Sequence, residues 1–568
     1  MRAHPLSDQG LDNLFPPSYR ISPFLPLCEE AFHVLGDLMP NGDLPRVPGW
    51  QGLDGFPDLL TVYGALPHGP EPNPHLLVRR MTADLLAGAV NWRCADLQYN
   101  LGAAVNVVAA ALYALALDVN VYLINDGLAG NVLVAENAVG RILSDLAGLG
   151  KGQAHGVFVF GGTGTMAYAI KAGLRKSAPE SARTGLPSGV KLLVTEDAHF
   201  SHATAADWLG VGCDDLLVVP AGPDRRSRLD EAEQLLRDAL EGGHLVPTIL
   251  VNGGTTYDHA IDDISGFVRL RDQLVVDYRL PYFPHVHVDS VVGWAWLMFG
   301  RYDFQTNPLG VESEALEMLH RQHRRISDLR YADSWGVDFH KGVGGCPIDC
   351  SVVMFNDRAD LVRLSKGDGP TAAIHQLAEE FSSESPVDYT LETSRAGGKA
   401  LAALASLHSL GQSGYRALLA NLIENTVLFR ATVGRQDGMS VLNPYALGYQ
   451  TMVRLHPPGV TMEPDRHREM EASDSETSAL VARGNRYLKA FFAWDNSTRM
   501  DVNGGGVVYS FSRKYIRTPS GTDISGLKFY PTSPRITRDH VLDAVDLLCR
   551  RKAQFDAAHE NEWTDAAG

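Results

Sequence analysis

From about residue 103 onward, the chain alternates short apolar runs with segments of helical periodicity. Residues 131–148 place Val134, Ala138 and Ile142 four positions apart, which predicts a helix with one buried face. Strands that are apolar on both faces are typical of a mostly parallel sheet covered by helices on both sides. The pattern therefore predicts an α/β fold, with strands at residues 156–160, 191–195, 215–219, 248–252, 284–289 and 350–355.

The two ends of the chain have a different pattern. The first hundred residues are rich in proline and glycine and have few long periodic segments, which predicts an irregular arm. The apolar stretch 103–124 predicts a buried helix that leads into a strand. After residue 425, a strand at 505–511 and a helix at 539–555 predict a small α+β domain. We expect an arm (1–102), a large domain (103–424) and a small C-terminal domain (425–568).

Composition narrows the class of protein. The 568 residues include 67 acids and 50 bases, a net charge of −17 that argues against a nucleic-acid-binding surface. Six scattered cysteines fit neither a disulfide framework nor a four-sulfur zinc site. The first fifteen residues lack the apolar core of a signal peptide, and Asn106 and Asp118 interrupt the longest apolar stretch. We therefore expect a cytoplasmic enzyme that does not associate with membranes.

An apolar strand followed by glycine, threonine and a helix is the first candidate site. In residues 157–165, free N–H groups at the helix start and the hydroxyls of Thr163 and Thr165 could cradle an anion. The third glycine of a dinucleotide loop and the Gly-Lys-Ser/Thr of a Walker A loop are both missing. Taken alone, the motif is equally compatible with a tight strand-to-helix turn.

The second candidate is the strand 284–289. Its alternation puts His285, His287 and Asp289 on one face. Two histidines and a carboxylate could bind a metal. Asp289 could instead contact a ligand at the carboxyl end of a buried strand, and either histidine could be a hydrogen-bonded core residue.

The third candidate is Lys341, which lies between His340 and Gly342 in a segment that separates two apolar runs. Burial of a lysine lowers its pKa and makes the amine nucleophilic. A surface lysine beside a glycine turn is the alternative interpretation. An anion cradle, a buried aspartate and a Schiff-base lysine are together what pyridoxal 5′-phosphate requires.

With these three features in this order, the sequence resembles the group II pyridoxal-phosphate-dependent amino-acid decarboxylases, over roughly residues 130–420. The resemblance implies fold type I, as in aspartate aminotransferase, and implies a role for several residues. It places the phosphate at Gly162 and Thr163, the ring-stacking histidine at His199 in the motif 197–201, and a site-lining threonine at Thr255 in the motif 252–256.

The same resemblance covers the centre of the site. Asp289 becomes the partner of the pyridine nitrogen, with Ser290 where the family usually has alanine. Ser334, His340 and Lys341 match the lysine motif, so the first two are expected to bind the cofactor and Lys341 to hold it covalently. The arginine segment of the family matches residues 393–397.

The resemblance implies α-decarboxylation of an L-amino acid to a primary amine and CO2 by a homodimer with a shared active site. Tyr389 is the only tyrosine between Lys341 and Arg395, and it is expected to protonate Cα. The polar segment 364–386 is expected to be a mobile loop over the site. Residues 91–100 are expected to line the substrate pocket or to pack at a dimer seam.

Other outcomes stay open. On the same scaffold, decarboxylation could be coupled to oxidative deamination, which gives an aldehyde, or the reaction could be that of a carbon–carbon lyase. A family member that has lost catalysis and keeps a binding role is a third alternative, against which intact Lys341, Asp289 and His199 argue. The cofactor explains Asp289 without a metal, so no metal site is expected.

Overall fold

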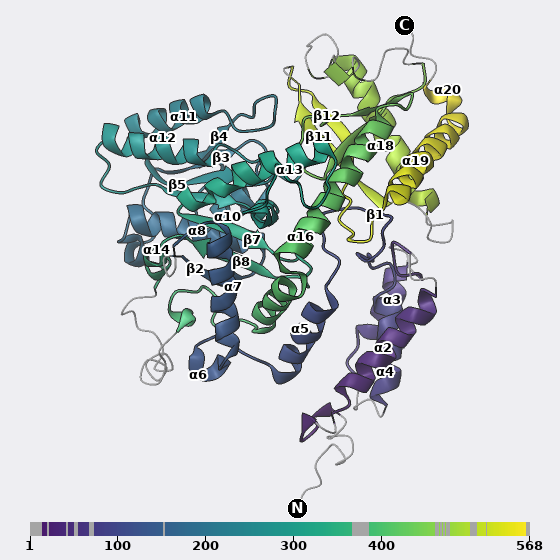
Figure 1. Ribbon diagram of the computed structural model, residues 1–568, viewed down its shortest axis with the longest axis horizontal. Helices are drawn as coiled ribbons and strands as arrows, with labels where there is room; N and C mark the ends of the chain where they lie inside the picture. Colours follow the sequence, from purple (N-terminus) through teal and green to yellow (C-terminus); the bar gives the residue numbers. More distant parts are fainter. Residues whose placement is uncertain are drawn as a thin grey trace, which may run out of the picture.

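The computed structural model describes residues 14–19, 22–40, 44–49, 55–67, 73–150, 154–365, 385–459, 465, 468–469, 472, 478–499, 508–518 and 520–563. Most of the loop expected at 364–386 therefore lies outside the described residues. Helices and strands alternate through the centre of the chain, as the apolar pattern predicts (Figure 1).

A seven-stranded sheet forms the centre of the large domain. Its strand order is β2-β8-β7-β6-β5-β3-β4, and all pairs are parallel except the two that β8 makes. The mostly parallel α/β sheet is thus confirmed, and six of its strands are the six predicted apolar runs. The strands are β2 (His155–Val159), β3 (Val190–Thr195), β4 (Leu216–Val219), β5 (Leu245–Asn252), β6 (His285–Asp289), β7 (Ser334–Asp338) and β8 (Ser351–Phe355).

Helices cover both faces of this sheet. Helices α8 (Gly162–Ser177) and α10 (Ser201–Trp208) pack on one face, where Met166, Ile170 and Leu250 share a core. The second face packs on a larger core that includes Val286 and Val288. Its helices include α7 (Val132–Leu146), α11 (Leu229–Glu241), α12 (Ile264–Asp277), α13 (Ser313–Ile326) and η4 (Gly293–Phe299), while α14 (Arg358–Val362) follows β8.

The small domain is built on a second sheet of five strands in the order β1-β11-β12-β10-β9. Strand β1 comes from the predicted arm and pairs with β11 in parallel. Helices α18 (Ser478–Arg499), α19 (Arg538–Ala558) and α20 (Glu560–Trp563) complete it. The strands are β1 (Leu97–Gln98), β9 (Met439–Val441), β10 (Thr451–Leu455), β11 (Val508–Arg517) and β12 (Asp523–Phe529).

One long helix connects the two sheets. Helix α16 (Gly398–Val433) contains a break at Gly411, whose φ of 59° lies in the left-handed region that glycine tolerates. The helix predicted at 399–410 corresponds to the part before this break. The expected boundary at residue 424 falls inside the second part of α16, so it would divide a continuous helical segment.

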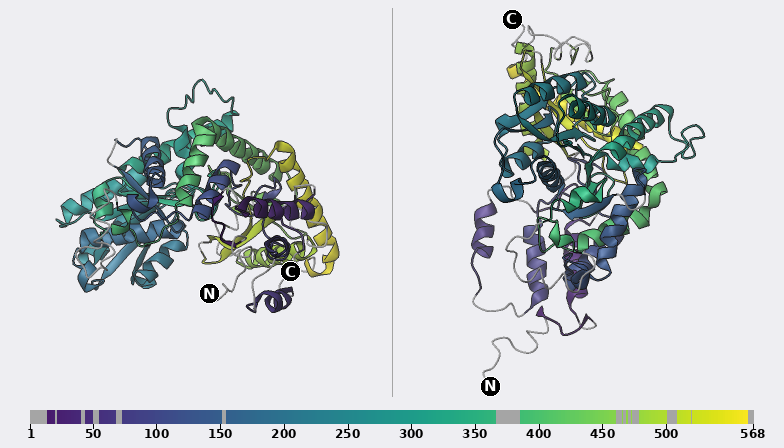
Figure 2. Two further views of the ribbon diagram at one scale, coloured as in Figure 1. Left: turned by 90° about the horizontal axis from the view of Figure 1, so that it is seen from below. Right: turned by 90° about the vertical axis from the view of Figure 1, so that its left-hand side faces the viewer.

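The arm is more helical than its proline content predicts. Helices α2 (Phe24–Leu38), α3 (Phe56–Tyr63) and α4 (Pro74–Leu85) project from the rest of the molecule (Figures 1 and 2). Helix α5 (Val107–Val119) replaces the buried helix and strand expected at 103–124. That expectation is wrong because α5 packs on α16 with one side only, and much of its apolar surface stays exposed.

The arginine segment has a structural role. Arg395 is 5% exposed and donates hydrogen bonds to both carboxylate oxygens of Glu136, at 2.5 and 3.1 Å, and to the Leu123 carbonyl at 3.0 Å. Glu136 also accepts from the Phe158 backbone N–H at 2.9 Å. The ion pair therefore joins α7, the central sheet and the start of α16.

We expect Arg395→Met to lower the free energy of unfolding by about 3–5 kcal/mol, because it leaves the Glu136 carboxylate buried without its partner. Urea denaturation would measure the loss. Replacing both residues by methionine should cost less than Arg395→Met alone, because no charge then stays buried. A single variant as stable as the wild type would contradict this role.

Candidate active site

Four of the predicted site residues meet at the carboxyl ends of the parallel strands. Asp289 ends β6, Lys341 follows β7, His199 follows β3 and Thr255 follows β5. Side chains at this edge of an α/β sheet are placed for ligand binding. These four residues line one pocket together with Gly162, Thr163, Ser201, Asn252, Gly254, Thr256, Val291, Val292, Asp338 and His340.

Lys341 makes an ion pair inside this pocket. Its Nζ lies 2.8 Å from Oδ2 of Asp338, the last residue of β7, which is completely buried. Burial lowers the pKa of Lys341, but the Asp338 and Asp289 carboxylates outweigh burial and raise it. The expectation of a lowered Lys341 pKa is therefore wrong for this state, because the sequence argument considered burial without Asp338.

Asp289 is held ionised by its neighbours. Its Oδ2 lies 2.9 Å from Nε2 of His202, on α10. Burial opposes ionisation, but the hydrogen bond from His202 and the charges of His202 and Lys341 hold the pKa of Asp289 below its usual range. Among the described residues nothing bonds to Oδ1 of Asp289, which is buried. A buried carboxylate oxygen without a donor indicates that a ligand supplies one.

His199 has a defined proton position. The backbone N–H of Ser201 donates to Nδ1 of His199 at 3.2 Å, and the Ser201 hydroxyl lies 2.8 Å from the same atom. Burial lowers the pKa of His199, so the ring is neutral near pH 7. Because Nδ1 accepts, the single proton of the neutral ring lies on Nε2.

The predicted anion cradle corresponds to the start of α8. Gly162 and Thr163 begin this helix and line the pocket, where the helix N-terminus favours negative charge. A Cβ on Gly162 would lie 3.1 Å from Oδ2 of Asp338 and 3.2 Å from Val291. A side chain at this position would therefore press on Asp338 and Val291, which line the same pocket.

Two more predicted residues line the pocket. Thr255 accepts a hydrogen bond from the Ala260 backbone N–H at 3.1 Å, which fixes the loop after β5. His340 lies with Nδ1 3.3 Å from the Cys350 carbonyl and Nε2 3.7 Å from Asp338 Oδ2. Both side chains therefore line the pocket, where they can contact a bound molecule.

Ser334 does not line the pocket. It is fully buried in the middle of the sheet, and its hydroxyl lies 2.6 Å from His285 Nε2 and 2.7 Å from His287 Nδ1. The expected direct contact of Ser334 with the cofactor is corrected accordingly. In the described part of the chain, His285 has its candidate ligand atom close to those of Asp333 and Asp360, so the set of His285, His287 and Asp289 is not brought together as a metal site.

Tyr389 lies outside the pocket as well. It is 8% exposed in a core with Val157, Val159 and Phe355, and its hydroxyl lies 3.4 Å from His155 Nε2. The expected role as proton donor is therefore corrected to packing against β2 and β8. Residues 91–100 form β1 and its approach, and none of them lines the pocket.

Sequence reasoning missed Asp338 and His202. Both lie three positions from a predicted site residue: Asp338 precedes Lys341, and His202 follows His199. Neither position belongs to an apolar pattern, and a buried ion pair cannot be read from periodicity.

In the described part of the chain, no helix is both long and apolar enough to cross a lipid bilayer.

Comparison with known sequences finds decarboxylases. L-2,4-Diaminobutyrate decarboxylase of Rhizobium meliloti is 28% identical over 318 residues, which cover 55% of this chain and 56% of that enzyme. L-Tyrosine decarboxylase of Enterococcus faecalis is 28% identical over 271 residues, which cover 43% of this chain and 41% of that enzyme. The chain thus spans about half the length of these curated relatives. No family model matches it.

Comparison with solved structures covers nearly the whole chain. The crystal structure of mouse CSAD has a TM-score of 0.73 at 16% identity, over 93% of this chain and 98% of that one. The crystal structure of Oryza sativa TDC with PLP and tryptamine has a TM-score of 0.71 at 13% identity, over 95% of this chain and 99% of that one. These likenesses establish the fold. The chain is therefore related in sequence to the group II pyridoxal-phosphate-dependent amino-acid decarboxylases and has their fold type I.

Proposed function

We propose that the chain binds pyridoxal 5′-phosphate and catalyses the α-decarboxylation of an L-amino acid to the primary amine and CO2. The observation that carries this proposal is the pocket that joins Lys341, Asp289 and the start of α8. Its chemistry fits the cofactor group by group: an amine for the aldehyde, a carboxylate with an unbonded oxygen for the pyridine nitrogen, and a helix N-terminus for the phosphate.

The bound cofactor would supply an electron sink for the pair released at Cα when CO2 leaves. Lys341 would react as a neutral amine, and Asp338, whose Oδ2 lies 2.8 Å from its Nζ, would take the proton that the ammonium gives up. The ionised Asp289 would hold a proton on the pyridine nitrogen. Gly162 and Thr163 would hold the phosphate end.

The proton that replaces CO2 at Cα needs a donor. Nε2 of His199 carries the proton of a neutral imidazole in the pocket, and Ser201 fixes the orientation of the ring. A neutral imidazole is too weak an acid to give up this proton, so we propose that Nε2 of His199 donates it from the imidazolium form and that the ring returns to neutral, the role first predicted for Tyr389. Burial of the pocket residues limits water, which would compete as a proton source.

Release of CO2 from each of the twenty L-amino acids and from L-2,4-diaminobutyrate tests the function. The relatives are named for diaminobutyrate, tyrosine, aspartate and glutamate, so the screen must span basic, aromatic and acidic side chains. We expect CO2 and amine in equal amounts from one side-chain class. Aldehyde with ammonia would support the oxidative alternative, and no CO2 from any substrate would contradict decarboxylation.

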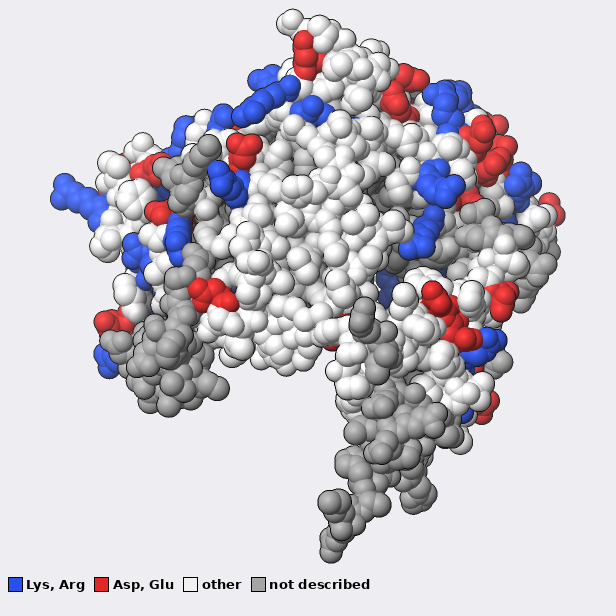
Figure 3. All heavy atoms as spheres, turned by 60° about the horizontal axis from the view of Figure 1, so that its bottom comes forward, with Lys and Arg blue, Asp and Glu red and all other residues white. Residues whose placement is uncertain are grey.

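We further propose that the chain acts as a homodimer. Figure 3 shows a broad face with few charged groups, at the end of the molecule where α5 lies. Helix α5 exposes Val107, Leu115 and Leu117, each at more than half of its surface. The arm helices add Phe32 and Leu60, both 65% exposed. Apolar surface of this extent is typical of an interface between subunits.

We expect sedimentation equilibrium to give twice the chain mass of 61.8 kDa. The double change Val108→Glu and Leu115→Glu places two charges on one exposed face of α5 and should give monomers without activity. Val276→Glu, at a 72% exposed position on α12, is the matched control and should stay dimeric. An active wild-type monomer would contradict this proposal.

A further inference from the structure

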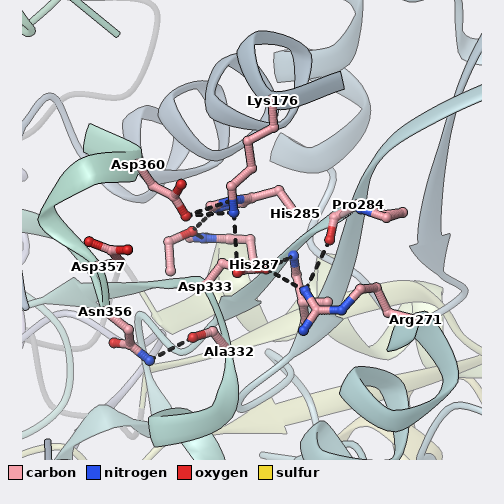
Figure 4. A network of polar contacts seen from close by, with 12 residues as sticks. Lys176, Arg271, Pro284, His285, His287, Ala332, Asp333, Asn356, Asp357 and Asp360 are labelled. Atoms are coloured by element: carbon pink, nitrogen blue, oxygen red, sulfur yellow. Dashed lines mark hydrogen bonds and ion pairs between the residues drawn. The ribbon is translucent and has the colours of Figure 1, made fainter. Parts of the chain in front are cut away.

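A lysine ammonium stands at the centre of a buried group of acids and imidazoles behind the pocket (Figure 4). Nζ of Lys176, in the last turn of α8, lies 3.3 Å from His285 Nδ1, 3.2 Å from Asp333 Oδ1 and 2.5 Å from Asp360 Oδ2. Ligand atoms of His285, Asp333 and Asp360 lie close enough together to hold a metal ion. In this structure the ammonium takes the place of such a cation.

The ammonium fixes the proton of His285. A lysine ammonium has donors and no acceptor, so Nδ1 of His285 must accept. Burial and the charge of Lys176 hold the pKa of His285 well below its usual value, so the ring is neutral and has a single proton. That proton lies on Nε2, which donates to the Ser334 hydroxyl at 2.6 Å.

The same argument fixes the proton position of the next imidazole, His287. Ser334 accepts from His285, so its one proton is free to be donated to Nδ1 of His287 at 2.7 Å. Burial lowers the pKa of His287 to about 3, so this ring is also neutral and carries its proton on Nε2. Within the described residues this nitrogen is buried and has no hydrogen-bond partner.

The chain of donors ends beside Asp289. His287 and Asp289 are two residues apart on the same face of β6, and the Asp289 charge acts on His287. Nδ1 of His287 is bonded to Ser334, so the N–H of this ring is the last donor of the chain. The donors thus follow one another from His285 to His287, the direction in which β6 runs toward Asp289.

We propose that Lys176 orients a one-way hydrogen-bond chain through His285, Ser334 and His287, whose positive end helps to keep Asp289 ionised. These four residues are positioning residues, and none of them lines the pocket. The role of Asp289 as the partner of the pyridine nitrogen rests on the proposed function. The proton positions are a property of the protein alone and are tested without cofactor or substrate.

Neutron crystallography of the protein without cofactor shows the proton positions directly. We expect deuterium on Nε2 of His285 and of His287, and none on their Nδ1 atoms. Deuterium on Nδ1 of His287 would overturn the proposal, and this measurement needs no variant that has to fold.

Lys176→Met then tests the origin of the direction. Without the ammonium, His285 should take its proton on Nδ1, which lies 3.9 Å from Asp360 Oδ2, and His287 should follow through Ser334 by moving its proton to Nδ1. Lys176→Arg keeps a cationic donor and should keep both protons on Nε2. An unchanged His287 in the folded methionine variant would show that Lys176 does not set the direction.

The effect on the site is measured by cofactor binding. We expect the dissociation constant of pyridoxal 5′-phosphate to rise roughly two- to fivefold in Lys176→Met, the size of a dipole acting on a nearby charge, and to recover in Lys176→Arg. An equal rise in both variants would indicate general disruption and overturn the electrostatic role. If the wild type binds no cofactor, the proposed function fails while the neutron result stands.

Discussion

Lys341→Ala is expected to reduce amine release by about 10³-fold or more and to remove the visible absorbance of the bound cofactor. Loss of a covalently acting group typically has an effect of this size. Within the described residues that line the pocket, Lys341 is the one lysine. Absorbance spectra and single-turnover assays would measure the two losses.

Two further variants separate chemistry from folding. Lys341→Arg keeps a cation beside Asp338 but has no amine that can react with an aldehyde, so it should fold and be equally inactive. Lys171→Ala, at a half-buried position of α8, should keep both activity and absorbance. Substantial turnover in Lys341→Arg would mean that the covalent role belongs to another residue.

Asp289→Asn is expected to keep the fold and to reduce kcat by roughly 10- to 150-fold, since a charge-assisted hydrogen bond contributes about 1.5–3 kcal/mol. The amide can still accept a bond from His202, but it has no charge to hold a proton on the pyridine nitrogen. Steady-state kinetics with cofactor in excess would measure the loss.

Asp207→Asn is the control for this change, because Asp207 is an exposed carboxylate on α10, the helix that carries His202. It should leave kcat unchanged. Near-normal kcat in Asp289→Asn would refute the assigned role, and an unfolded variant would point to a structural role for the His202–Asp289 bond.

The sequence predicted the structure best where apolar residues alternate or run together in a buried strand. Alternation along β6 placed Asp289 on the face away from Val286 and Val288, and those valines do pack in the opposite core. The apolar runs located six strands of the central sheet. Strand β7 (Ser334–Asp338) was missed because serine, glycine and aspartate give it no apolar pattern.

The errors share a cause: each depends on contacts between distant parts of the chain. Asp338 reverses the pKa shift of Lys341, and no local pattern indicates an aspartate buried beside it. Tyr389 was chosen because it is the one tyrosine in its interval, yet it packs against β2 and β8. Helix α5 was read as buried because its apolar residues resemble a core, although much of that surface is exposed.

The central claim is that this chain forms a covalent bond to pyridoxal 5′-phosphate through Lys341. Borohydride reduction of the protein loaded with cofactor, followed by proteolysis and mass spectrometry, tests it most directly. The account predicts the phosphopyridoxyl group on the peptide that contains Lys341. Its appearance on Lys171 or Lys399, or its absence from every lysine, would contradict the account.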